Sequence, residues 1–168
     1  RIALLGDGEL FQTGFLNNAL ATVVATPGGT IAAATPDGAV AIVNAALAQV
    51  ETDTLETYMA TDLVLPTAVY NILATRRMTD TNMTVLNYIR ENAVVPNLTI
   101  RKSRHLTTTM IAYANLPDVH RFHLPGGGHE LGAPWQKGPY SWEVPGVFGT
   151  GGYELRVPKA VVRMTGIA

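Results

Sequence analysis

The most constraining feature of the sequence is the order in which two hydrophobic periodicities follow one another. Between residues 35 and 92, apolar side chains recur at spacings of three and four, which is typical of amphipathic helices. From residue 98 onward, apolar and polar residues alternate in several short segments, which is typical of strands with one buried face. Helices first and strands later indicate an α+β fold rather than repeated βαβ units.

The helical part predicts three helices and one buried strand. Thr35 is a suitable N-cap and Pro36 a suitable first residue for a helix that ends near residues 51–54. Residues 62–66 predict a buried strand, and Pro66 opens a second helix with Arg76 and Arg77 near its carbonyl end. Asp80 or Thr81 is expected to cap the third helix. The expected core-facing residues are Val40, Val43, Leu47 and Val50, then Val69, Ile72 and Leu73, then Val85, Leu86 and Ile89.

The second part predicts strands separated by a long connection. Segments 97–103, 106–115 and 118–124 have the alternation or the β-branched and aromatic content of strands. Residues 125–152 hold many of the glycines and prolines, so we expect an irregular crossing there. Alternation returns in residues 153–157, which favours a closing strand.

The composition limits the function classes. Charged residues make up only 15% of the 168 residues, against roughly 25% in an average soluble domain, so we expect surface that is covered by sister subunits. A large buried core is the alternative explanation. The net charge is −1, and the one short basic run, residues 101–105, favours a solvated strand end over a nucleic-acid site. The chain has no cysteine, and no apolar stretch reaches the ~20 residues that span a bilayer.

Three of the four histidines lie close together in the segment HRFHLPGGGHELGAPW. One interpretation is a small metal-dependent hydrolase that uses His120, His123, His129 and Glu130. The other is a corner where the chain leaves a sheet. Because the segment resembles a strand, a separation of three residues sends His120 and His123 to opposite faces. We therefore predict no metal site.

Other catalytic patterns are weakly supported. The glycines at 126–128 and 149–152 lack the Lys-Ser/Thr and the helix that follow a phosphate-binding loop. The chain has only two serines, Ser103 and Ser141, and neither lies in a G-x-S-x-G motif. We accordingly predict no catalytic residue and no cofactor-binding residue.

The aromatic residues near the end of the chain leave two interpretations open. Trp135, Tyr140, Trp142, Phe148 and Tyr153 are compatible with a β-rich module that binds carbohydrate or peptide. Aromatic side chains are also common anchors in cores and at subunit interfaces. We favour the second interpretation, in which these rings anchor a crossing segment to the core or to a neighbouring subunit.

The order of these segments resembles tailed-phage major capsid proteins. TDLVLPTAVYNILATRRMTDTNMTVLNYIRENA resembles their buried strand ending in Leu-Pro, followed by a helix, a turn and a second helix. NLTIRKSRHL and TTMIAYANLPDVHRFHLP resemble the strands that come next. GGYELRVPKAVVRMTGI resembles the final segment of one branch, and GFLNNALATVVATP resembles the stretch after the long spine helix.

The resemblance implies the Hong Kong phage-type capsid fold, which encapsulins share: an axial domain and part of a peripheral domain, with a mixed sheet flanked by short helices. It implies a peripheral segment at 1–34, an axial α+β domain at 35–124, and a crossing with a return to the peripheral domain at 125–168. HLPGGGHELGAPW would be the exit from the axial sheet, with Trp135 fixing its far end. The arm, extended loop and spine helix of this fold have no counterpart here, so we expect a C-terminal fragment.

The function that the resemblance implies is structural. We expect a non-catalytic subunit of an icosahedral phage or prophage shell, assembled from pentamers and hexamers in the host bacterial cytoplasm and located in the virion. Packaged DNA would be contacted at most non-specifically, and no membrane or cofactor would be involved. The metal-dependent hydrolase and the carbohydrate- or peptide-binding module are the alternatives.

Overall fold

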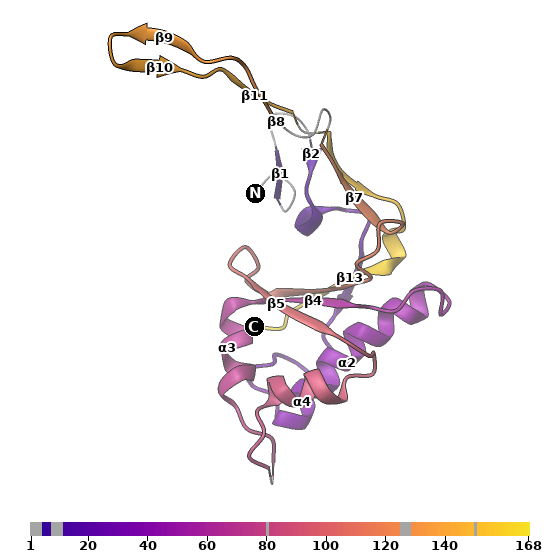
Figure 1. The fold of residues 1–168 in the computed structure, drawn as a ribbon. Helices are drawn as coiled ribbons and strands as arrows, with labels where there is room; N and C mark the ends of the chain where they lie inside the picture. Colours follow the sequence, from indigo (N-terminus) through magenta and orange to yellow (C-terminus); the bar gives the residue numbers. More distant parts are fainter. Residues whose placement is uncertain (1–4, 8–11, 80, 125–128, 150) are drawn as a thin grey trace. The chain divides into compact units, whose positions relative to one another are not determined.

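The computed structural model describes residues 5–7, 12–79, 81–124, 129–149 and 151–168 (Figure 1). The chain divides into two compact units. Unit 1 comprises Arg1–Asn18 and Arg121–Glu154, and unit 2 comprises Ala19–His120 and Leu155–Ala168. These boundaries differ from the expected ones at residues 34 and 124, because strands from residues 19–34 and 155–168 join the same sheet as the middle of the chain.

Unit 2 is built on a mixed five-stranded sheet with the order β3-β13-β6-β4-β5. Strand β13 runs parallel to β3 and antiparallel to the central strand β6, and β4 runs antiparallel to β6 and parallel to β5. The strands are β3 (Thr22–Ala25), β4 (Asp62–Pro66), β5 (Thr99–Ser103), β6 (Thr109–Tyr113) and β13 (Val161–Thr165), the last preceded by the 3-10 turn η3 (Pro158–Ala160).

Three helices cover one face of this sheet (Figure 1). They are α2 (Pro36–Asp53), α3 (Thr67–Thr75) and α4 (Val85–Asn92). The Thr35 hydroxyl accepts a hydrogen bond from the Gly38 amide at 3.2 Å, so the predicted N-cap of α2 is confirmed. The helices and the sheet enclose one core, whose largest fully buried side chains include Leu47, Leu63, Leu65, Leu73, Ile89, Met110, Met164 and Ile167.

The expected core faces are mostly confirmed. Val43, Leu47, Val50, Val69, Leu73, Val85, Leu86 and Ile89 are buried, whereas Val40 and Ile72 are only half-buried. The prediction that Thr81 caps α4 is wrong. The helix begins at Val85, and its N-cap is Thr84, whose hydroxyl accepts a hydrogen bond from the Asn87 amide. Asp80, the other predicted cap, lies outside the described residues.

Arg76 has a different role from the one its position suggested. Helix α3 ends at Thr75, and the Arg76 guanidinium donates hydrogen bonds to the carbonyls of Ile31, Ala32 and Ala34 at 2.7–2.9 Å. Because the guanidinium carries several donors in a rigid fork, one side chain satisfies three carbonyls of a turn more than 40 residues earlier. The residue therefore fixes the loop that leads into α2.

Unit 1 consists of short strand pairs. The pairs are β1 (Gly6–Asp7) with β2 (Gln12–Thr13), β7 (His120–His123) with β12 (Gly152–Leu155), β8 (His129–Leu131) with β11 (Gly146–Phe148), and β9 (Trp135–Gly138) with β10 (Ser141–Glu143). The 3-10 turn η1 (Phe15–Asn17) follows β2, and the Phe15 ring meets the edge of Tyr153 with centroids 5.5 Å apart.

The prediction of an irregular crossing at 125–152 is wrong for most of that segment. Residues 129–149, called the exposed hairpin below, run out through β8 and β9 and back through β10 and β11 (Figure 1). Every residue of β10 and β11 is exposed, so the strands show no alternation between a buried and a solvated face. Alternation was the pattern that could have revealed them in the sequence. Residues 125–128 and 150 lie outside the described part.

Within the described residues, none of the helices has the length and hydropathy needed to cross a membrane.

Replacing Leu47 by Asp tests the core of unit 2. Leu47 is fully buried, so the change removes apolar contacts and inserts a charge without a partner. We expect the free energy of unfolding to fall by about 3 kcal/mol or more, measured by chemical denaturation. Ala41→Asp places the same charge on the exposed side of α2 and should have a much smaller effect. Equal losses for the two variants would contradict the assigned core face.

Candidate functional site

The histidines predicted as alternative metal ligands have separate environments. His120 lies against the Tyr113 ring, with centroids 5.5 Å apart. His123, on the same strand, makes a 2.8 Å contact from Nε2 to a carboxylate oxygen of Glu154. Glu130 is exposed in β8, and the side chain of His129 lies outside the described part. Among the described residues, no three His, Asp or Glu side chains are grouped as a metal would require.

The absence of a metal site stays a prediction, and elemental analysis tests it. We expect purified protein to carry no stoichiometric zinc. One tightly held metal ion per chain, lost in His123→Ala but retained in Glu91→Ala, would contradict this expectation and support the metal-dependent interpretation.

A buried polar cluster of unit 2 lies on adjacent strands β4, β5 and β6. The carboxylate of Asp62 is almost fully buried; it accepts a hydrogen bond from the Thr61 hydroxyl at 3.0 Å and lies 3.3 Å from Nε of Arg101. Burial, reinforced by the Asp62 charge and opposed by Arg101, raises the pKa of Tyr113 to about 12. Burial lowers the pKa of His120 below its ordinary value, and the Asp62 charge acts against this shift.

This cluster does not have the features of a catalytic site. Tyr113 with a raised pKa stays neutral at ordinary pH, so it supplies no base. Asp62 is held by Thr61 and Arg101, which is the arrangement of a structural ion pair that joins β4 to β5. Sequence reasoning did not find this cluster, because its members are 51 residues apart along the chain and only the sheet register brings Asp62 opposite Tyr113.

The lowered pKa of His120 predicts how the stability of unit 2 depends on pH. Above about pH 6.5 the ring is neutral in both folded and unfolded states, so its contribution is fully present. Below that pH the unfolded chain binds the proton more readily, so stability falls as the pH falls. Denaturant unfolding between about pH 7.5 and pH 5 should show a shallower loss for His120→Gln than for the wild type. Parallel curves would show that His120 does not contribute.

The remaining catalytic candidates have local structural roles. The Ser103 hydroxyl accepts a hydrogen bond from the His105 amide at 3.2 Å, within the turn after β5. Ser141 begins strand β10 in the exposed hairpin. Gly152 has φ of 86°, a conformation that favours glycine, which explains its place at the start of β12. Gly126–Gly128 lie outside the described residues.

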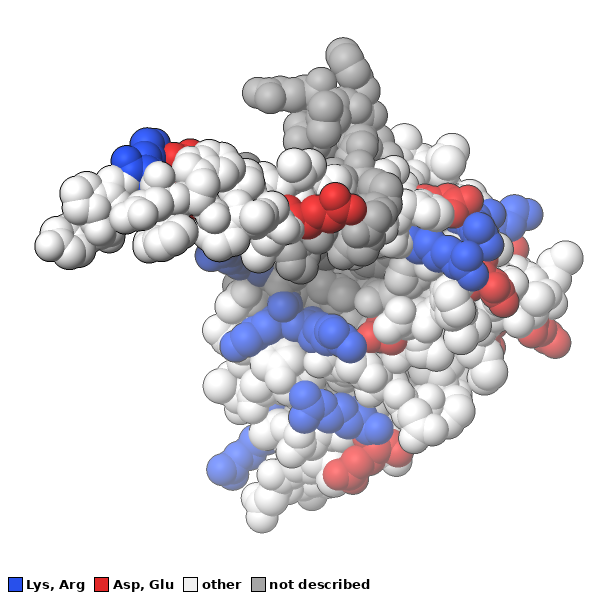
Figure 2. All heavy atoms as spheres, turned by 45° about the horizontal axis from the view of Figure 1, so that its top comes forward, with Lys and Arg blue, Asp and Glu red and all other residues white. Residues whose placement is uncertain are grey.

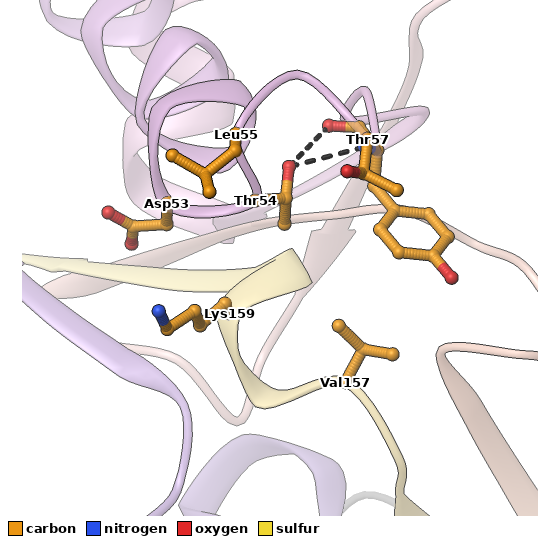
Figure 3. A pocket seen from close by; sticks show the side chains of 7 residues that line it. Asp53, Thr54, Leu55, Thr57, Val157 and Lys159 are labelled. Carbon is orange, nitrogen blue, oxygen red and sulfur yellow. Dashed lines mark hydrogen bonds between the residues drawn. The ribbon is translucent and has the colours of Figure 1, made fainter.

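One open depression lies where α2 ends (Figure 3). Its volume is about 220 Å³, and it is lined by Asp53, Thr54, Leu55, Thr57, Tyr58, Val157 and Lys159. Leu55 and Glu56 have φ of 52° and 62°, a left-handed conformation that is uncommon for residues other than glycine. The Thr54 hydroxyl holds this turn, 2.7 Å from the Val50 carbonyl and 3.2 Å from the Tyr58 amide. The depression is smaller than typical ligand pockets.

The exposed hairpin carries most of the large apolar side chains on the surface of unit 1. Tyr140 is 100% exposed, Trp142 64%, Phe148 63% and Trp135 49%. Of the two anchors that the sequence left open for Trp135, a core or a neighbouring subunit, the described residues do not provide the first. In the space-filling view most of the hairpin is uncharged (Figure 2). Two of its charged residues, Lys137 and Glu143, form an ion pair at 2.7 Å.

The cross-strand register places the two indoles on opposite faces of the hairpin. Trp142 lies opposite Gln136, whereas Trp135 lies opposite Glu143. Residues that face each other across an antiparallel pair share a face, and neighbours along a strand do not. The two tryptophans therefore cannot form one stacking platform, which argues against the carbohydrate-binding alternative built on Trp135, Tyr140 and Trp142.

Two glycines let the strands of the hairpin approach closely. A Cβ at Gly132 would lie 2.6 Å from Cγ of Pro145, and the Gly132 amide donates a 2.8 Å hydrogen bond to the Pro145 carbonyl. A Cβ at Gly138 would lie 2.9 Å from Oγ of Ser141. These contacts help define the geometry of the hairpin, whose strands β10 and β11 are exposed throughout.

Comparison with known proteins identifies the family. A family model described as major capsid protein matches residues 1–167. The capsid of Myoviridae phage XM1 is similar, with a TM-score of 0.83, 21% identity, and coverage of 99% of this chain and 59% of the other. A virus-like particle from Pyrococcus furiosus has a TM-score of 0.60 at 15% identity, covering 89% and 58%. Mycobacterium phage Che8 has a TM-score of 0.55 at 14% identity, covering 86% and 54%. No curated protein matches the sequence.

The chain belongs to the family of major capsid proteins, the structural subunits of virus shells. The resemblance stated from the sequence is thereby confirmed, and the expected α+β capsid fold with a mixed sheet is confirmed by the structural similarity. The chain spans about three-fifths of the length of the phage XM1 capsid chain that it matches.

Proposed function

We propose that the chain is part of a self-assembling, non-catalytic subunit of an icosahedral phage or prophage shell. Membership of the major capsid protein family is the observation that carries this proposal. The similarity of the fold to a phage capsid over nearly the whole chain supports it. The low share of charged residues also supports it, because surface that sister subunits cover needs few charges.

The division of the chain into two compact units supports an axial and a peripheral part, with boundaries other than the expected ones. We propose that unit 2, with its own core and five-stranded sheet, is the axial domain, and that unit 1 belongs to the peripheral domain. Symmetric rings bury identical surfaces in every subunit, so pentamers and hexamers are the assembled state that we propose. The proposed location is the virion, after assembly in the cytoplasm of the host bacterium.

Contact with packaged DNA is proposed to be weak and independent of sequence. The edge strand β5 carries exposed Arg101 and Lys102, and Arg104 follows it. Arg101 is paired with Asp62, and Lys102 lies over the Tyr70 ring at 5.5 Å. Two of the three charges therefore have partners within the chain, so few phosphate contacts are available.

Electron microscopy and light scattering test the proposed function. The full-length protein that carries this chain is expected to form rings or closed shells. The 168-residue chain alone is expected to remain a monomer or a small oligomer in dilute solution, prone to self-association through exposed apolar surface. A full-length protein that stays monomeric at high concentration, with or without a scaffold protein, would contradict the proposal. Closed shells formed by the short chain alone would contradict the second expectation.

A further inference from the structure

We propose that the exposed hairpin is inserted between other copies of the chain in the assembled shell, so that both of its faces become covered. This inference rests on the proposed function and adds the surface through which the subunits meet. It concerns residues 129–149, where both tryptophans of the chain lie. The occupant to which the proposal commits is a second copy of the same protein.

The evidence for contact on both sides is that apolar side chains occupy both faces of the hairpin. Trp142 and Trp135 lie on opposite faces of the outer strand pair β9–β10. In the inner pair, Phe148 lies opposite His129 and Val147 lies opposite Glu130, so these two apolar residues also occupy opposite faces. A surface strand pair that packs against one partner needs only one apolar face. Apolar residues on both faces indicate burial from both sides.

The size of the apolar surface is appropriate for contact between subunits. Trp135, Tyr140, Trp142 and Phe148 are between 49% and 100% exposed. With about 150–250 Å² for each aromatic side chain, the four rings alone expose on the order of 500 Å². Isolated patches on monomeric proteins rarely exceed a few hundred Å², and a standard interface buries about 800 Å² on each partner. The two faces of the hairpin together therefore offer apolar surface on the scale that contacts between subunits bury.

The charges of the hairpin favour a protein partner over DNA or a membrane surface. Lys137 and Glu143 neutralise each other at 2.7 Å, and Glu130 adds a negative charge. Phosphate-rich partners require several free cations, which the described part of the hairpin does not offer. A nearly neutral, aromatic surface is complementary to another apolar protein surface. Because the chain belongs to a family of shell subunits, a further copy is the protein partner present in every particle.

The low stability expected of an uncovered hairpin also supports contact with neighbouring copies. A two-stranded hairpin without a third strand or a covering layer is marginally stable in water. The strands β10 and β11 are exposed throughout, and β8 and β9 pair only with them in the described sheets. Coverage on both faces by neighbouring copies would supply the packing that the described part of the chain does not give the hairpin.

Tryptophan fluorescence tests the proposal without a label, since residues 135 and 142 are the two tryptophans of the chain. In the full-length protein, acrylamide should quench the emission strongly in dissociated subunits and several-fold less in assembled particles. Two single-tryptophan variants, Trp135→Phe and Trp142→Phe, report on the two faces separately. We expect protection at both positions. Protection at only one position would overturn the two-sided contact, and equal quenching before and after assembly would overturn the docking altogether.

A charge substitution provides a second, independent test. Trp142→Glu should raise the protein concentration needed for assembly by about tenfold or more, as expected for a buried aromatic residue at an interface. Trp142→Phe keeps an apolar ring and should assemble close to the wild type. The thermal unfolding of unit 2 should be the same in both variants, which excludes a folding defect.

The outcomes separate this inference from the proposed function. Particles that form normally from Trp142→Glu would overturn the inference while leaving the shell function intact. A wild-type protein that forms no particles would overturn both. Protection of both tryptophans together with impaired assembly of Trp142→Glu would support the inference.

Discussion

The arrangement of unit 2 depends on the pairing of β13 between β3 and β6. This strand consists of residues 161–165, yet its partners lie at residues 22–25 and 109–113, so it joins the two ends of the chain to its middle. Val162 and Met164 of this strand are buried in the core beneath the helices. Closing such a long loop has a large entropic cost, which the apolar burial along three adjacent strands offsets. The same pairing explains why residues 19–34 and 155–168 belong to one unit.

Unit 2 and the exposed hairpin differ in how far their apolar side chains are buried. In unit 2, apolar side chains from three helices and several strands fill one shared core, and Arg76 satisfies three carbonyls of a distant turn. In the hairpin, aromatic side chains of comparable size remain in solvent. The first arrangement is complete within one chain. In the second, the contact proposed between copies would remove the rings from water and lower the free energy further.

Much of unit 2 could be predicted from local sequence, since helix periodicity and capping act over a few residues. Thr35 at the start of α2 and the strand at Asp62–Pro66 are confirmed at the predicted positions. Three features could not be predicted, because they depend on distant partners or on the absence of a core. The Arg76 contacts cross more than 40 residues, the Asp62–Tyr113 proximity follows from sheet register, and the hairpin lacks the alternation that burial imposes. The aromatic residues were predicted to be anchors, and the sequence left open whether they anchor to the core or to a neighbour.

The low charge of the chain and the exposure of the hairpin have a common physical explanation in an assembling protein. Charged side chains at an interface must lose water, and that desolvation is often not repaid by pairing, so surfaces that will be covered carry few of them. The hairpin satisfies this constraint by pairing Lys137 with Glu143 within itself. An isolated subunit with such a surface is prone to non-specific association. Closed symmetry removes this hazard, because each apolar surface meets its specific partner and none remains exposed at the end of assembly.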